Sequence, residues 1–195
     1  MGRIVLLSDG LNTFIGQNLL SRQVCRENLE NKKIMLFYEP YYSIEGKLID
    51  ACLKLGFRKE NIGTSMEEAF IKNISESDYI YVTEGNTFEI LKVLREKKCM
   101  KAIKNAVERG AVYIGASAGA LIAGKDIRLA ADFDKNDAKM KEEEMDGLGL
   151  FDGTILPHCT KSELAVYLKK KDLKELSRYS KIYSVANGKI LVLHT

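Results

Sequence analysis

Short apolar runs alternate along the chain with longer amphipathic segments, and this alternation is the feature that most restricts the fold. The runs are rich in branched and aromatic residues and are bounded by polar or turn residues, which predicts strands buried on both faces. The predicted strands cover residues 4–7, 34–38, 79–82, 112–114 and 155–156. Parallel strands need crossover segments of about a dozen residues, and the intervals here are long enough to supply them.

Helical patterns fill most of the intervals between these strands. They cover residues 14–29, 44–55, 87–97, 100–109 and 162–176. Two of them end at Gly56 and Gly110, and glycine just past a helix is a common stop because it accepts a left-handed backbone. The alternation predicts an α/β fold, a three-layer sandwich with a largely parallel central sheet.

The end of the chain predicts one further element. The segments 182–186 and 189–194 flank Asn187-Gly188, a dipeptide that tolerates the positive φ values of a two-residue turn. We therefore expect a C-terminal β-hairpin.

Composition narrows the classes of function. The 195 residues contain no linker-like stretch, so we expect a single domain over residues 1–195. The 30 basic and 27 acidic residues are interspersed, which argues against a nucleic-acid partner. Cys25, Cys52, Cys99 and Cys159 are widely separated, so we expect no metal site. The first apolar run is too short for a signal-peptide core, and we expect a cytoplasmic protein with no membrane partner.

The stretch GASAG directly follows the predicted strand 112–114. Ligands of open α/β sheets bind at the carboxyl ends of strands, so Ser117 stands where a site is expected. A serine on a sharp strand-to-helix turn needs small neighbours, which two glycines and two alanines provide. Such a turn directs backbone N–H groups, including that of Ala118, toward a developing oxyanion. Small residues that only allow close helix packing are the alternative interpretation.

A serine nucleophile needs a base, and the chain has only His158 and His194. His194 is the penultimate residue, and a fraying terminus is a poor place for a base. His158 follows another predicted strand, so it could share the sheet edge with Ser117. Many carboxylates between Ser117 and His158 could orient the histidine. Of these we favour Asp132, because it ends the apolar run 127–131 while most others belong to a charged stretch.

These motifs resemble dipeptidase E, the aspartyl dipeptidases, and the related cyanophycinases, a family of serine peptidases. YIGASAGA resembles the family's Gly-x-Ser-Ala-Gly-Ala, VTEGNTFEIL its Gly-Gly-Asn-Thr-Phe segment, and GLGLFDGTILPH its Gly-Leu-Gly-Leu run ending in Pro-His. The resemblance implies a fold like that of class I glutamine amidotransferases, which is flavodoxin-like. It also implies Ser117 as nucleophile, His158 as base and Asp132 as the third catalytic residue.

The resemblance further implies that Gly85, Asn86 and Thr87 contribute to the oxyanion hole and the substrate pocket. Asn86 and Glu89 also fit a capping box that opens a helix. Glu84 departs from the family, which more often has glycine there. A carboxylate close to the oxyanion hole would oppose negative charge developing there, whereas a side chain pointing away would leave only backbone amides to the site.

Three functional hypotheses follow. The first is a serine peptidase that needs no metal or organic cofactor and hydrolyses short peptides. Here the resemblance favours dipeptides with an N-terminal aspartate, although no arginine or lysine is uniquely placed to read that side chain. The second is a catalytically impaired homologue that binds a small ligand or a partner. The third is an esterase of the α/β-hydrolase type, whose His-Gly oxyanion motif is missing here.

Overall fold

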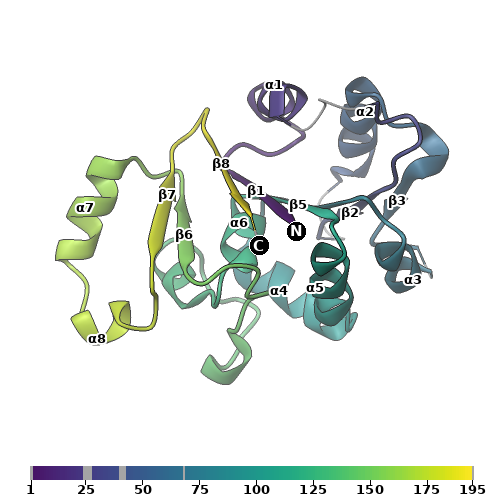
Figure 1. The fold of residues 1–195 in the computed structure, drawn as a ribbon. Coiled ribbons are helices and arrows are strands. Elements are labelled where there is room, and N and C mark those ends of the chain that lie inside the picture. The colour runs from purple at the N-terminus through teal and green to yellow at the C-terminus, as the bar shows by residue number, and fades with distance from the viewer. Residues whose placement is uncertain (1, 24–27, 40–42, 68, 195) are drawn as a thin grey trace.

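The computed structural model describes residues 2–23, 28–39, 43–67 and 69–194 (Figure 1). Its central sheet has the order β3-β2-β4-β5-β1-β8, in which β8 is antiparallel to β1 and the other neighbours are parallel. The strands are β1 (Arg3–Leu7), β2 (Ile34–Phe37), β3 (Ile62–Thr64), β4 (Tyr79–Val82), β5 (Val112–Ala116) and β8 (Ile190–His194). The predicted α/β fold with a largely parallel sheet is confirmed.

Helices cover both faces of this sheet, which gives three layers (Figure 1). One face carries α1 (Phe14–Gln23) and α2 (Glu45–Leu55), and the other carries α3 (Phe70–Ser75), α4 (Thr87–Glu96), α5 (Met100–Glu108) and α6 (Ala118–Ala123). Successive side chains of a strand point to opposite faces. In β1, Val5 and Leu7 therefore pack in the core under α1 and α2, whereas Ile4 and Leu6 pack in the core on the other face.

The parallel strands end in register at one edge of the sheet. Leu7 pairs with Ala116, and Val82 pairs with Gly115. The residues that follow β1, β2, β4 and β5 therefore gather at the same carboxyl edge, which is where open α/β sheets bind their ligands.

A second, smaller sheet contains β6 (Thr154–Pro157) and β7 (Ile182–Val185), which pair in parallel. It lies beside the central sheet together with α7 (Lys161–Lys169) and α8 (Leu173–Leu176) (Figure 1). The helix predicted over residues 162–176 is thus interrupted between α7 and α8. Short 3₁₀ helices also occur at η1 (Lys59–Asn61), η2 (Arg128–Asp132) and η3 (Glu142–Glu144).

The predicted C-terminal hairpin is wrong in its pairing. A tight turn does form, because Lys189 N–H donates to the Ala186 carbonyl at 3.1 Å and Gly188 has a φ of 70°. The flanking strands, however, enter different sheets: β7 pairs with β6, and β8 pairs with β1. Each strand thereby extends a sheet that packs on the core. An isolated two-stranded hairpin would be only marginally stable in water.

The sequence patterns did not predict every helix and strand. β3 and α3 were not predicted, because three and six residues are too few for a hydrophobic period to show. The helix predicted over residues 14–29 is described up to Gln23, and residues 24–27, which include Cys25, lie outside the described part of the chain. None of the described helices is long and apolar enough to cross a membrane.

Candidate active site

Ser117 lies on the sharp turn between β5 and α6. Its φ of 48° and ψ of −106° are values that L residues rarely adopt, and its N–H donates to the Leu7 carbonyl at 2.9 Å. A Cβ on Gly119 would lie 2.2 Å from the carbonyl oxygen of Val82, and one on Gly115 would lie 2.5 Å from that of Gly119. Close packing of α6 on β4 and β5 therefore requires glycine at both positions, as the small-residue pattern predicted.

His158 lies within hydrogen-bond distance of Ser117. The Oγ of Ser117 and the Nε2 of His158 are 3.0 Å apart. The histidine directly follows β6, and its N–H donates to the Oγ of Ser8 at 2.8 Å. That buried hydroxyl in turn donates to the Val185 carbonyl at 2.6 Å. Ser8, which sequence reasoning missed, thus joins the ends of β1, β6 and β7 and positions His158.

The other ring nitrogen of His158 is bonded to Asn187. Nδ1 lies 2.6 Å from the Oδ1 of Asn187. Because an amide oxygen only accepts, this contact places the ring proton on Nδ1 and leaves Nε2 to accept from the hydroxyl of Ser117. Asp9 fixes the turn that carries Asn187, because its Oδ2 accepts from the N–H of Gly188 at 2.6 Å. Serine, imidazole and amide form one hydrogen-bonded chain.

Asp132, which was expected to orient His158, is bonded elsewhere. Its carboxylate accepts from the hydroxyl of Tyr167 and binds the ammonium of Lys171, both at 2.5 Å. Partial burial acts to raise the pKa of Asp132, but these two bonds outweigh it and hold the pKa below its ordinary value. The expected strand before Asp132 is the 3₁₀ helix η2 instead, and from its end the carboxylate reaches α7 rather than the histidine.

The N–H groups of Ala118 and Gly85 are the ones that the resemblance assigns to an oxyanion hole. Ala118 is the first residue of α6, so the helix supplies no acceptor for its N–H. Within the described ranges, neither this N–H nor that of Gly85 donates to another protein group. Gly119 N–H donates to the Thr83 carbonyl at 3.1 Å, which holds the loop of Gly85 beside the turn. Gly85 has a φ of 143°, a value that favours glycine.

Glu84 is held by the loop that follows β1. Its carboxylate accepts from the N–H of Gly10 at 3.2 Å and from the Nδ2 of Asn12 at 2.7 Å. The sequence left two orientations open for this side chain. The structure shows the carboxylate bound by other protein groups, which leaves the N–H of Gly85 free.

Asn86 and Thr87 begin α4. The Oδ1 of Asn86 accepts from the N–H groups of Phe88 at 3.0 Å and Glu89 at 3.2 Å, so Asn86 caps the helix, but the return bond from the Asn86 N–H to the Glu89 side chain that completes a capping box is not formed. Thr87 lines the same pocket as Ser117, and both its N–H and its hydroxyl donate to Asp134. Of these two predicted binding residues, Thr87 faces the pocket, while the Asn86 side chain organises the start of the helix.

A pocket of about 360 Å³ opens over Ser117 and His158. Its wall includes the apolar side chains of Leu121 and Leu156. Cys159 also lines it, and burial, followed by the nearby charge of Glu163, raises the pKa of this thiol. The thiol therefore stays protonated at neutral pH and does not compete with the serine as a nucleophile.

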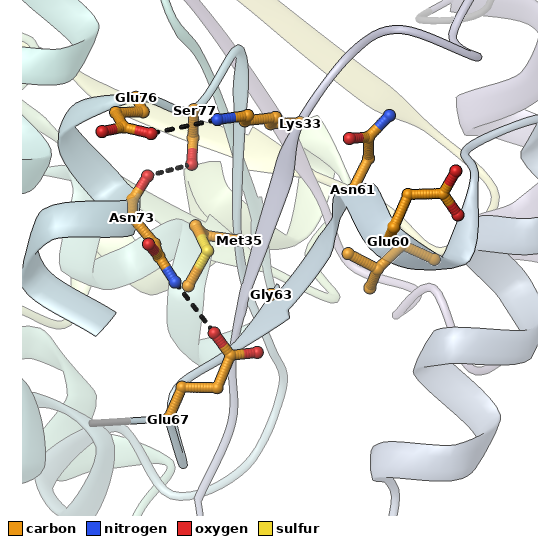
Figure 2. Close-up of a pocket in the computed structure, with 10 residues that line it drawn as sticks. Lys33, Met35, Glu60, Asn61, Gly63, Glu67, Asn73, Glu76 and Ser77 are labelled. Atoms are coloured by element: carbon orange, nitrogen blue, oxygen red, sulfur yellow. Dashed lines mark hydrogen bonds and ion pairs between the residues drawn. The ribbon is translucent and has the colours of Figure 1, made fainter. Parts of the chain in front are cut away.

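A second hollow, of about 150 Å³, lies beside the first halves of β2 and β3 (Figure 2). Four of its charged and polar side chains bind in pairs: Lys33 pairs with Glu76 at 3.0 Å, and Asn73 donates to Glu67 at 2.9 Å (Figure 2). Across residues 2–23, 28–39, 43–67 and 69–194, no group of three or more His, Cys, Asp and Glu side chains could hold a metal ion.

Glu39 is a buried carboxylate behind the loop of Gly85. It is 6% exposed, and its Oε2 has no hydrogen-bond partner in the described part of the chain. A Cβ on Gly85 would lie 3.7 Å from that oxygen. Burial, followed by the nearby charge of Glu89, raises the pKa of Glu39 above its ordinary value.

The family follows from a comparison with known proteins. The model of peptidase family S51 matches residues 39–195. The chain belongs to peptidase family S51. This S51 peptidase is therefore a serine peptidase, as the resemblance implied, and the esterase hypothesis is set aside.

Relatives of this S51 peptidase include an uncharacterized peptidase of Listeria monocytogenes, 29% identical over 153 residues, which are 78% of this chain and 74% of that protein. Peptidase E of Citrobacter koseri is 42% identical over 87 residues, 45% of this chain and 36% of the relative. The chain thus aligns with about a third of the length of that Peptidase E.

Solved structures share the fold. The crystal structure of a peptidase from an acI-B1 Actinobacterium superposes with a TM-score of 0.67 at 15% identity, and the superposition covers 100% of this chain and 84% of that one. A Listeria monocytogenes EGD-e protein assigned to peptidase E has a TM-score of 0.69 at 22% identity, with 100% and 99% covered.

We expect Gly119→Ala to destabilise the protein and to reduce peptidase activity. Its Cβ would collide with the backbone of β4, and such overpacking costs about 1–3 kcal/mol or more. Gly46→Ala is the matched control, since a Cβ on Gly46 in α2 would have no atom within 4 Å. That change should stabilise by about 0.5–1 kcal/mol. Urea unfolding checks both, and equal effects would contradict the packing described for α6.

We expect Glu39→Gln to raise the melting temperature at pH 7. A raised pKa means that the folded protein binds more protons than the unfolded one, so stability falls as pH rises from the unfolded to the folded pKa. Glutamine carries no charge and removes that loss. The variant and the wild type should converge below about pH 4, where the carboxyl is protonated in both states. Glu96→Gln, at an exposed position, should leave the melting temperature unchanged. If Glu96→Gln raises the melting temperature as much as Glu39→Gln does, burial of the Glu39 carboxylate does not destabilise the protein.

Proposed function

We propose that this S51 peptidase hydrolyses short peptides with Ser117 as nucleophile and His158 as base. The contact of 3.0 Å between Oγ and Nε2, at the floor of an open pocket, carries the proposal. As Oγ attacks the scissile carbonyl, Nε2 takes the hydroxyl proton and later gives it to the leaving amine. In the second half of the reaction, Nε2 takes a proton from a water molecule as that water attacks the acyl-enzyme. Nε2 then returns the proton to the Oγ of Ser117 as the product acid leaves. The N–H groups of Ala118 and Gly85 stabilise the oxyanion of each tetrahedral intermediate.

In this mechanism Asn187 holds the imidazole in the required tautomer. An amide oxygen accepts the Nδ1 proton as a carboxylate does, but it carries no charge that would stabilise the imidazolium. The resemblance gives this role to Asp132, which is bonded to Tyr167 and Lys171. The contacts therefore favour Asn187 over Asp132 as the orienting residue.

An N-terminal aspartate in the substrate stays a prediction, as does a cytoplasmic location. An aspartate side chain needs a cationic partner, and none of the described residues that line the pocket is lysine or arginine. The alternative of a binding protein without turnover was motivated by Glu84. Because that carboxylate is bonded to Gly10 and Asn12, its position does not favour the alternative.

The direct test is hydrolysis of a dipeptide panel with Asp, Glu, Ala, Leu or Lys at the first position. We expect wild-type protein to release free amino acids and Ser117→Ala to lose about 10³-fold or more of that rate. Ser21→Ala, at an exposed position on α1, is the control and should keep full activity. Unchanged release by Ser117→Ala would overturn the assignment of the nucleophile.

Substitution of Asn187 tests the orienting contact. Asn187→Ala should lower kcat about tenfold or more with little change in KM, because the imidazole loses its fixed tautomer. Asn187→Asp should restore activity and exceed the wild-type kcat, since a carboxylate also stabilises the imidazolium. If all three proteins have the same kcat, Asn187 serves only the turn.

A further inference from the structure

The pocket above Ser117 is lined by acidic side chains. Asp134 and Glu163 both contribute to its wall, and the described lining residues include no lysine or arginine. Negative charge at the wall of a cleft attracts cations and repels anions. The charge of the lining therefore bears on which peptides can enter.

Asp134 is fixed with one oxygen bound and one oxygen open. Its Oδ2 accepts from the N–H of Thr87 at 2.9 Å and from the hydroxyl of the same residue. Its Oδ1 has no hydrogen bond to any group in the described ranges. Because Thr87 is the first residue of α4, the carboxylate is anchored to a helix rather than to a loose loop. The open oxygen is preorganised to accept a hydrogen bond from a ligand.

Glu163, which also lines the pocket, has a similar arrangement. Its Oε2 accepts from the N–H and the hydroxyl of Thr160, at 2.8 Å and 2.6 Å. These bonds hold the pKa of Glu163 below its ordinary value, so it is an anion at neutral pH. Its Oε1 has no protein partner in the described chain.

The rest of the wall suits the stem of a long side chain. Phe133 and Tyr167 stack with their ring centroids 5.9 Å apart, and both line the pocket with Leu121 and Leu156. Aromatic faces attract cations, and although the Lys171 ammonium already lies 5.4 Å from the centre of the Tyr167 ring, Phe133 is 58% exposed. The methylene stems of lysine and arginine pack on apolar surface while their charged ends reach polar groups. An aspartate side chain has neither a long stem nor a positive charge.

We propose that the pocket selects peptides with an ammonium or guanidinium group close to the scissile bond, and that Asp134 recognises this group. The positive group is either the free N-terminal ammonium or a basic side chain, and both would donate to Oδ1. The inference rests on the proposed function in so far as the peptide binds in the pocket of Ser117.

Binding is measured with the Ser117→Ala protein, in which turnover is blocked. The probes are Lys-Ala, Leu-Ala and Asp-Ala, with N-acetylated Lys-Ala and Leu-Ala, titrated by calorimetry. If a basic side chain is recognised, Lys-Ala should bind at least about tenfold more tightly than Asp-Ala; if the N-terminal ammonium is recognised, Leu-Ala should bind at least about tenfold more tightly than its N-acetylated form. If affinity for Lys-Ala survives acetylation, the side chain is recognised; if acetylation weakens both peptides alike, the N-terminal ammonium is recognised.

Asp134→Asn, added to Ser117→Ala, should abolish this preference for positive charge, while its amide oxygen can still accept from Thr87 and preserve the fold. Asp137→Asn makes the same change of charge at an exposed ion pair with Lys135, outside the pocket, and should keep the preference. Melting temperatures verify that both variants are folded. Equal affinity for all peptides, tightest binding of Asp-Ala, no binding at all, or equal losses in the two variants would overturn the inference.

Turnover by the wild type separates this inference from the proposed function. Cleavage of Lys-Ala, Leu-Ala, Asp-Ala and the two N-acetylated peptides at similar kcat/KM would overturn the selection for positive charge and leave the peptidase mechanism standing. Charge-selective binding by Ser117→Ala without any cleavage by the wild type would support the selection and overturn the proposed mechanism.

Discussion

The close packing of α6 on β4 and β5 is the constraint on which the whole site depends. Gly119 lies against the backbone of Val82, and its carbonyl accepts from the buried hydroxyl of Tyr113 at 2.8 Å. Two residues before Gly119, Ser117 has a positive φ at the turn into α6, and the N–H of Ala118, the first residue of that helix, has no helical acceptor. A single strained backbone conformation thus supplies both the serine and one oxyanion donor, and the packed core bears the strain.

The base comes from a different sheet, and the join between the two sheets sets its position. The hydroxyl of Ser8, at the end of β1, binds His158 after β6 and Val185 at the end of β7. Because β8 leaves β7 and pairs with β1 instead, the turn between them crosses the catalytic edge beside Asp9. The departure from a simple hairpin is therefore what brings Asn187 to the imidazole.

The carboxylates around the site differ in what their oxygens bind. Glu84 is bonded to Gly10 and Asn12, and burial raises the pKa of Glu39. Asp134 and Glu163 both line the pocket, and each has one oxygen without a hydrogen-bond partner in the described ranges. Carboxylates at the wall of a cleft favour a positive charge that arrives with a substrate.

The sequence by itself determined the layered α/β fold, the serine at a strand-to-helix turn and the histidine at a strand end. These follow from local rules: a buried strand needs a continuous apolar run, and a sharp turn needs small neighbours. It could not show that Asp132 binds Tyr167 and Lys171, or that Asn187 reaches His158. Those contacts depend on which edges β7 and β8 join and on how η2 directs a carboxylate, and long-range burial decides both.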